Sequence, residues 1–259
     1  MKFLKISLVF IPSLIQAQSW EKTGELKINK SASYYTADIQ GNFYLGFKDG
    51  GLVKYNSEGE LLENFALSNS SSITLIDVQN NLKPFIFYFD NQQITILDRF
   101  SSVPKNYYLQ DYSVQLGMIA CPAPDGDIWV IENNPQRLIK ISTLRKSVVL
   151  EVQLDLGDSI NKIQAYQNLL IVGHNQGIHV LDQYGGRVYS KQISDMRYFQ
   201  LINDQLLAFT QGGILQFDPI SGRDIGKISL KGNPDGVLKL KEKFLYINDR
   251  KLSFYNYTE

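Results

Sequence analysis

The sequence is poor in the side chains that bind metals and form covalent cross-links. Its 259 residues include one cysteine and two histidines. The single cysteine, Cys121, cannot form a disulfide within the chain, and because it ends an apolar run we expect a buried thiol rather than a nucleophile. Basic and acidic side chains number 26 each. This balance argues against a nucleic-acid-binding protein, since such binding depends on an excess of positive charge.

Motifs of the common catalytic and cofactor-binding classes are missing as well. The chain has no Gly-x-Ser-x-Gly sequence, no glycine-rich phosphate-binding loop and no cluster with zinc-ligand spacing. Residues 125–127, Asp-Gly-Asp, lack the alternating oxygen ligands and the distal glutamate of a calcium loop, so we interpret them as a turn. We therefore expect no catalytic residue, no cofactor and no bound metal.

An apolar run that could engage a membrane occurs near the N-terminus, at residues 3–15, and it is too short to span one comfortably. Lys2 and Lys5 give its start a positive charge. We interpret residues 1–17 as a secretory signal peptide, cleaved after Ala17, with an uncleaved anchor as the alternative. Residues 18–259 would then be a periplasmic chain that is not itself inserted into a membrane.

What the chain does contain is a repeat. A short apolar strand followed by a small polar residue occurs six times, first as Gly-Leu-Val-Lys-Tyr-Asn at residues 51–56. The polar residues that mark the six copies are Asn56, Asp98, Ser142, Asp182, Asp218 and Asn256, at intervals of 42, 44, 40, 36 and 38 residues. A period of about 40 residues is typical of the blades of a β-propeller.

Two apolar columns accompany each polar residue, one four positions before it and one directly before it. Because positions three apart on a strand point to opposite faces, both faces of this strand are predicted to be covered, as in sheets stacked around a ring. The polar residue is predicted to start a turn by accepting a bond from a backbone N–H two residues on. His179 occupies a column that is otherwise aliphatic, Thr or Ser, so we interpret it as a packing residue. His174 lies in a predicted turn and is weak support for acid–base catalysis.

The repeat predicts an all-β fold: a single six-bladed β-propeller of four-stranded antiparallel blades. The first five copies each have four strand-like segments, and short turns join the segments of blades four and five. The sixth copy has three, whereas residues 20–29 form a spare segment at the other terminus. Pairing this N-terminal strand with the last blade would close the ring and cover a bare sheet edge. Seven blades is the alternative.

Residues 38–46 (Asp-Ile-Gln-Gly-Asn-Phe-Tyr-Leu-Gly) and 125–130 (Asp-Gly-Asp-Ile-Trp-Val) resemble the two-component-regulator and quinoprotein-like propeller repeats. In those families an Asp-Gly-Asn type of turn precedes a strand that contains an aromatic residue. Quinoprotein-like propellers include redox enzymes and periplasmic scaffolds of outer-membrane assembly. Because this chain has fewer blades than the enzymes and lacks their metal and quinone ligands, the resemblance implies a scaffold. The composition, rich in Lys, Asn, Ile and Tyr, is similar to that of exported proteins of Bacteroidota-type bacteria.

Charged side chains divide unevenly between the two predicted faces of the ring. The face formed by the connections between blades and by the second-to-third-strand turns carries nine acidic and four basic residues: Asp49, Asp90, Asp111, Glu132, Asp155, Asp158, Asp195, Asp235 and Asp249 against Lys30, Lys48, Lys231 and Arg250. The opposite face holds Arg99, Arg145, Lys146, Arg187 and Arg223. Turns favour aspartate for backbone reasons alone. The other interpretation is electrostatic docking of a protein, with Asp49, Asp111, His174 and Asn175 of the acidic face among the contacts.

These observations predict a non-catalytic periplasmic propeller that binds a protein partner and no nucleic acid. The expected partner is an outer-membrane barrel or translocon complex, in which the chain would be an accessory subunit or plug of the type 9 secretion translocon or of a barrel assembly complex. Two alternatives remain open. One is a sensor of a small ligand or glycan, and the other is a propeller hydrolase or lactonase.

Overall fold

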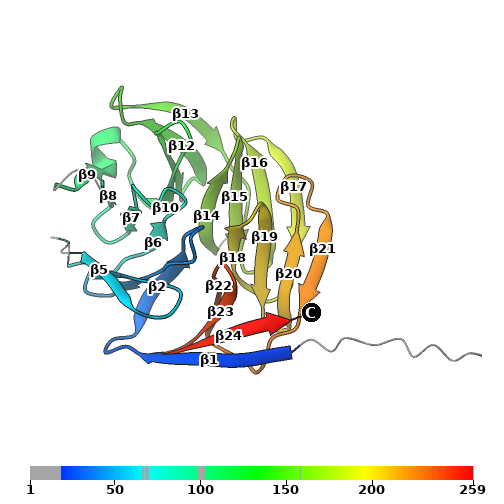
Figure 1. The fold of residues 1–259 in the computed structure, drawn as a ribbon. Helices are drawn as coiled ribbons and strands as arrows, with labels where there is room; N and C mark the ends of the chain where they lie inside the picture. Colours follow the sequence, from blue (N-terminus) through cyan, green and yellow to red (C-terminus); the bar gives the residue numbers. More distant parts are fainter. Residues whose placement is uncertain (1–18, 66, 68–69, 99–102, 158, 259) are drawn as a thin grey trace, which may run out of the picture.

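The computed structural model describes residues 19–65, 67, 70–98, 103–157 and 159–258. Within these residues, strands form six four-stranded sheets arranged around a ring (Figure 1). Neighbouring strands in each sheet are antiparallel. The six-bladed propeller is therefore confirmed over the seven-bladed alternative. The predicted signal peptide, residues 1–17, lies outside the described residues.

The first five blades are meanders that follow chain order from the inside of the ring to its rim. Blade one comprises β2 (Ala32–Ala37), β3 (Phe43–Phe47), β4 (Leu52–Tyr55) and β5 (Leu61–Phe65). Blade two comprises β6 (Leu75–Asp77), β7 (Phe85–Tyr88), β8 (Gln93–Ile96) and β9 (Lys105–Tyr108). Blade three comprises β10 (Gly117–Pro122), β11 (Ile128–Glu132), β12 (Arg137–Ser142) and β13 (Ser147–Gln153). Blade four comprises β14 (Ile160–Tyr166), β15 (Leu169–His174), β16 (Gly177–Asp182) and β17 (Arg187–Gln192). Blade five comprises β18 (Met196–Ile202), β19 (Gln205–Thr210), β20 (Gly213–Phe217), β21 (Asp224–Ile228), and the short 3-10 helix η1 (Leu109–Tyr112) follows β9.

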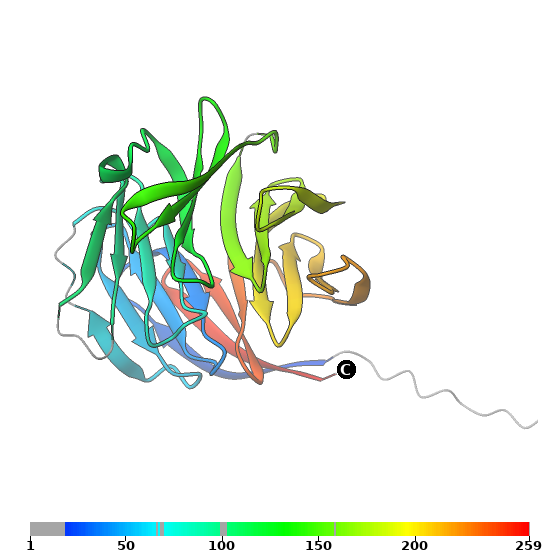
Figure 2. The same ribbon diagram turned by 90° about the horizontal axis from the view of Figure 1, so that it is seen from above.

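Blade six joins the two ends of the chain. Its strands, from the inside outward, are β22 (Gly236–Lys239), β23 (Lys243–Asn248), β24 (Lys251–Thr258) and β1 (Ser19–Lys27). The blue β1 runs beside the red β24 in both views (Figure 1 and Figure 2). The N-terminal strand therefore closes the ring, as predicted. One detail differs: Asn256 does not end a strand but lies inside β24, because β1 continues the pairing there with Glu21.

Side chains reinforce this closure. The Trp20 ring of β1 contacts Phe244 at a centroid distance of 5.1 Å and Tyr257 at 4.9 Å. Its Nε1–H donates to the carbonyl of Ser229, on the connection from blade five, at 2.9 Å. Trp20 thereby ties the outermost strand to the middle of its own blade and to the neighbouring blade.

Both apolar columns of the repeat face neighbouring blades. The aliphatic column is fully buried, with an exposed fraction of 0% at Leu52, Ile94, Leu138, Ile178, Ile214 and Leu252. In the second column four residues are buried and the two tyrosines, Tyr55 and Tyr255, are half-buried. Cys121 is also fully buried, as predicted. The sheets thus pack face to face around the ring.

At Asn56, Asp182 and Asp218 the polar residue of the repeat starts a turn in the way the sequence predicts, by accepting a bond from the N–H two residues on. Asn56 Oδ1 accepts bonds from the N–H groups of Glu58 and Glu60. Asp182 Oδ1 accepts from Tyr184 and Gly186 in the same way. These turns satisfy backbone donors at the strand ends, which explains why a short acceptor side chain recurs at this position.

Polar side chains of the innermost strands join one blade to the next. Lys162 Nζ of β14 donates to the carbonyl of Phe199 on β18 at 2.9 Å. Gln200 of β18 bonds both backbone groups of Lys239 on β22, at 2.8 and 2.9 Å. Directional bonds, together with apolar packing, therefore set how blades four, five and six line up around the channel.

Replacing Trp20 with alanine should destabilise the whole ring. The substitution removes the contacts with Phe244 and Tyr257 and the bond to Ser229, and truncation of such a side chain costs about 3 kcal/mol of unfolding free energy. Urea denaturation measures this loss as a lower midpoint at constant slope. Tyr184→Ala is the control, since Tyr184 is 68% exposed and should change stability by less than about 0.5 kcal/mol. Equal midpoints for Trp20→Ala and the wild type would show that the side-chain contacts of Trp20 do not stabilise the closure.

Candidate functional site

Blade two is the smallest blade, and a groove lies on each side of it. Its strands have three or four residues, whereas those of blade three have five to seven. A cavity of about 660 Å³ lies between blades one and two, and one of about 620 Å³ lies between blades two and three. Asp98, which follows β8, lines both. We take the first, referred to below as the rim groove, as the candidate functional site.

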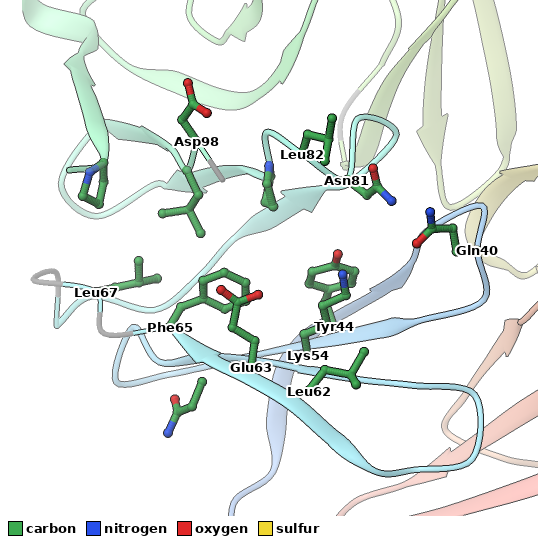
Figure 3. Close-up of a pocket in the computed structure, with 14 residues that line it drawn as sticks. Gln40, Tyr44, Lys54, Leu62, Glu63, Phe65, Leu67, Asn81, Leu82 and Asp98 are labelled. Carbon is green, nitrogen blue, oxygen red and sulfur yellow. The ribbon is translucent and has the colours of Figure 1, made fainter. Parts of the chain in front are cut away.

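The rim groove has apolar side chains on its two facing walls and polar side chains between them. One wall comes from β5 and the residues after it, with Leu62, Phe65 and Leu67, and the facing wall comes from blade two, with Leu82 and Leu97. Figure 3 shows Leu62, Phe65 and Leu67 on the side of β5 and Leu82 across the groove. Leu97 is buried, whereas the other four are only partly buried or exposed. The groove therefore offers accessible apolar surface between two rigid sheets.

The strand beside the groove has an open edge. β5 is the last strand of its sheet, and it pairs with β4 from Leu52↔Phe65 to Tyr55↔Leu61. No other strand of the described residues pairs with it. Leu61 and Leu62 are 58% and 52% exposed. An edge strand with exposed leucines is a template for pairing with another chain, unless something covers it.

The floor of the rim groove is polar, and its opposite charges lie close to each other. The Asp38 carboxylate is buried and accepts bonds from the N–H groups of Gln40 and Asn42 at 3.0 and 2.9 Å. Lys54 Nζ lies 3.8 Å from this carboxylate and 5.2 Å from the centroid of the Tyr44 ring. The positive charge of Lys54 is thus offset within the floor. The exposed carboxylate of Glu63 also lines the groove and adds a negative charge to its rim.

The four residues predicted to contact a partner lie on one face of the ring but on different blades. Asp49 is in the β3–β4 turn of blade one, Asp111 is in η1 after blade two, and His174 and Asn175 are at the β15–β16 turn of blade four. Asp49 is ion-paired with Lys30. The structure therefore brings His174 and Asn175 together and leaves Asp49 and Asp111 apart from them. Their role as partner contacts stays a prediction.

The predicted acidic face is partly neutralised by local pairs. Glu132 is 2% exposed and accepts bonds from the N–H groups of Gln115 and Leu116 at 2.7 and 3.0 Å and from Arg137 Nε at 3.0 Å. Burial alone would raise the pKa of the Glu132 carboxyl, but these donors outweigh it and hold the pKa below its usual range. Glu132 is thus a structural carboxylate, not part of an exposed surface. Asp158 and Arg99, assigned to the two faces from the sequence, lie outside the described residues.

The two histidines of the chain form a stacked pair. The His174 and His179 rings are 4.7 Å apart with an interplanar angle of 15°. His179 Nδ1 lies 2.6 Å from Ser190 Oγ on β17. Burial lowers the pKa of both imidazoles, and for His179 the charges of His174 and Arg187 lower it further. His179 is half-buried and lines a polar pocket of blade four. Its surroundings are therefore more polar than those expected for a residue that only packs between blades.

The rim groove itself was missed by the sequence analysis. Its signal was present as two adjacent leucines, Leu61 and Leu62, on a predicted outermost strand, where their side chains must point to opposite faces of the sheet. In the part of the chain that the structure describes, no group of three or more His, Cys, Asp or Glu side chains is placed to hold a metal ion. Nor does that part include a helix of the length and hydropathy needed to cross a membrane.

Comparison with known proteins identifies the fold. No protein-family model matches the chain, and no curated protein matches its sequence. Among solved structures, virginiamycin B lyase from Staphylococcus aureus is similar with a TM-score of 0.59 at 12% identity, over 93% of this chain and 99% of that one. The β-propeller domain of Cps50 (Swd1) from Myceliophteria thermophila gives 0.62 at 10%, over 93% and 100%. BamB from Moraxella catarrhalis is similar with a TM-score of 0.51 at 11% identity, over 92% of this chain and 98% of that one. These likenesses show a β-propeller and leave the function undetermined.

Replacing Glu132 with glutamine should destabilise the protein at neutral pH by about 2 kcal/mol, because bonds to a charged acceptor are stronger than bonds to an amide. The folded-state pKa of Glu132 is depressed, so its contribution is present above the unfolded pKa and is lost as the pH falls through the folded pKa. The gap between wild type and Glu132→Gln, measured by urea denaturation, should therefore shrink below about pH 4. A gap that is constant with pH would contradict this electrostatic role.

Proposed function

We propose that this protein is a non-catalytic propeller that binds a protein partner, and that the partner inserts an extended segment into the rim groove. The observation that carries the proposal is the open edge of β5, on which Leu61 and Leu62 are exposed and Leu62 lines a groove with apolar side chains on both walls. An added strand would satisfy the free backbone groups of β5 and cover these side chains. Burying two leucines of this kind contributes roughly 2 to 4 kcal/mol.

The charges at the groove suggest the chemistry of the partner segment. Side chains of an added strand alternate between two sides, so apolar residues at every second position would reach Phe65, Leu67 and Leu82. Glu63 would face a basic residue of the same segment. The partner is therefore an extended segment that mixes aliphatic residues with Lys or Arg. Complementary charge would raise the association rate and help to fix the register.

The place of action is inferred from the sequence. The expected export signal, the Bacteroidota-type composition and the resemblance to quinoprotein-like scaffold propellers support a periplasmic protein at the outer membrane. We infer that it serves as an accessory subunit or plug of an outer-membrane machine, either the type 9 secretion translocon or a barrel assembly complex. A rigid ring with a groove at its rim suits this role, because it can hold a segment of a larger partner without changing its own shape.

Replacing Leu62 with aspartate should weaken partner binding by about tenfold or more, since it places a charge among the apolar side chains that line the groove. The measurement is affinity purification from detergent-solubilised envelopes, with the outer-membrane proteins identified and quantified. Ile225→Asp is the matched control, because Ile225 is 48% exposed on β21 at the rim of blade five and does not line the groove.

Two results would contradict the proposal. Recovery of the same outer-membrane protein by wild type and Leu62→Asp would place the interface elsewhere, and the acidic-face residues Asp49, Asp111, His174 and Asn175 would be tested next. Recovery of no outer-membrane barrel or translocon protein by the wild type would remove the outer-membrane role and favour a soluble sensor or an enzyme.

A further inference from the structure

The outermost strands of the six blades differ in how their edges are protected against pairing with another chain. These strands are β5, β9, β13, β17, β21 and β1, and in the part of the chain that the structure describes each is the last strand of its sheet. Lysine side chains on an edge strand hinder such pairing. At least one lysine is present on β9, β17, β21 and β1, whereas β5 and β13 have none. Since β5 belongs to the rim groove, β13 is the unprotected edge that has no explanation yet.

The strand β13 presents a mostly apolar edge on the outer side of blade three (Figure 1). Its seven residues read Ser-Val-Val-Leu-Glu-Val-Gln, and Val148 and Val149 are 37% and 39% exposed. The register with β12 shifts once, at Val149, and is regular from Leu150 to Gln153. The one charged residue, Glu151, is ion-paired with Arg137 of β12. Its charge is thus offset within the blade, and the outer edge of β13 is left able to accept another strand.

The chain is basic just before β13 and acidic just after it. Arg145 and Lys146 lie in the turn from β12, and Asp155 follows the strand. All three are exposed, and within the described residues none of them forms an ion pair. Arg187 of blade four bonds the backbone carbonyl of Asp155, not its carboxylate. These side chains are therefore available to charges on a partner.

This distribution of charge makes β13 complementary to a second copy of itself. In an antiparallel pair the start of one strand lies opposite the end of the other. Two copies of β13 paired in this way would place Arg145 and Lys146 of each copy opposite Asp155 of the other. A parallel pair would instead place like charges together at both ends, so the charges select the antiparallel arrangement.

We propose that two copies of this chain form a homodimer by antiparallel pairing of their β13 strands about a two-fold axis near Leu150. The pairing joins the two copies of blade three into one continuous sheet and covers Val148 and Val149. Both copies use the same surface, so the assembly closes at two copies and does not propagate. A single seam of this length buries less than about 1,200 Å² in total, which is typical of weak complexes. The dimer therefore forms at high protein concentration.

Sedimentation velocity of the purified protein over a range of concentrations measures this equilibrium. We expect a monomer and a dimer, with no larger species, in the wild type. Val149→Lys supplies the lysine that β13 lacks and should raise the dissociation constant of the dimer at least about tenfold. Val188→Lys is the matched control and should leave the constant unchanged, because Val188 is 49% exposed on β17, an edge that already carries Lys191. Circular dichroism verifies that both variants are folded.

Charge reversal tests the antiparallel arrangement. Asp155→Lys makes both ends of β13 basic, and the double variant Arg145→Glu with Lys146→Glu makes both ends acidic. Each variant alone should dimerise about tenfold more weakly than the wild type, because like charges then meet at both ends of the seam. An equimolar mixture of the two should recover a dimer of about wild-type strength, since opposite charges meet again. Misfolded variants would not recover in this way.

Three results would overturn the proposal: a monomer at every concentration, a dimer that Val149→Lys leaves unchanged, or charge variants that do not recover when mixed. The proposal is independent of the protein-binding function of the rim groove, which lies at β5 of blade one. Leu62→Asp should therefore leave the dimer intact. A dimer that Leu62→Asp abolishes and Val149→Lys preserves would place self-association at β5 instead.

Discussion

The pairing of β1 with β24 is the constraint on which the rest of the structure depends. A propeller blade buries its two faces against two neighbours, so every blade needs a complete ring. The register from Ser19↔Thr258 to Lys27↔Lys251 supplies the last strand of blade six from the opposite end of the chain. Without this pairing, β24 would lose its neighbouring strand and Leu252 would be less well buried. The packing of blade six against the blades on either side would then weaken as well. Local pairing at one seam thus supports packing everywhere else.

A closed ring also explains why the rim groove persists. Blade two has shorter strands than its neighbours, and in an open stack of sheets the neighbours could move inward to fill the space. Here the inner strands are held in order around the channel, in part by the bonds of Lys162 and Gln200 to the next blade. The space beside the short strands of blade two is therefore kept open as the rim groove, which Leu62 and Leu82 line.

The fold could be predicted from the sequence because each of its signals is local and repeated. The spacing of Asn56, Asp182 and Asp218 reports one blade each, and the acceptor role of these residues depends on chain a few positions away. The functional features are not of this kind. Stacking of His174 on His179 follows from the hairpin register Val172↔His179, and the groove follows from a difference in length between blades. Each of these features occurs once in the chain, so the sequence repeat does not reveal it.

The central lysine is the feature that the fold explains least. A methionine at position 162 could fill the same space without the cost of burying a charge, and replacing buried charges by apolar groups is often neutral or stabilising. The bond from Lys162 to Phe199 is one of several between blades four and five, and Asn161 makes another to Arg197. Ring assembly therefore does not require a cation at this position. Part of the cost of burying this charge is offset by the Asp77 carboxyl of β6, which favours the charged form of Lys162 and opposes the lowering of its pKa by burial. This separates Lys162 from Glu132, whose buried charge is fully accounted for by its own hydrogen bonds.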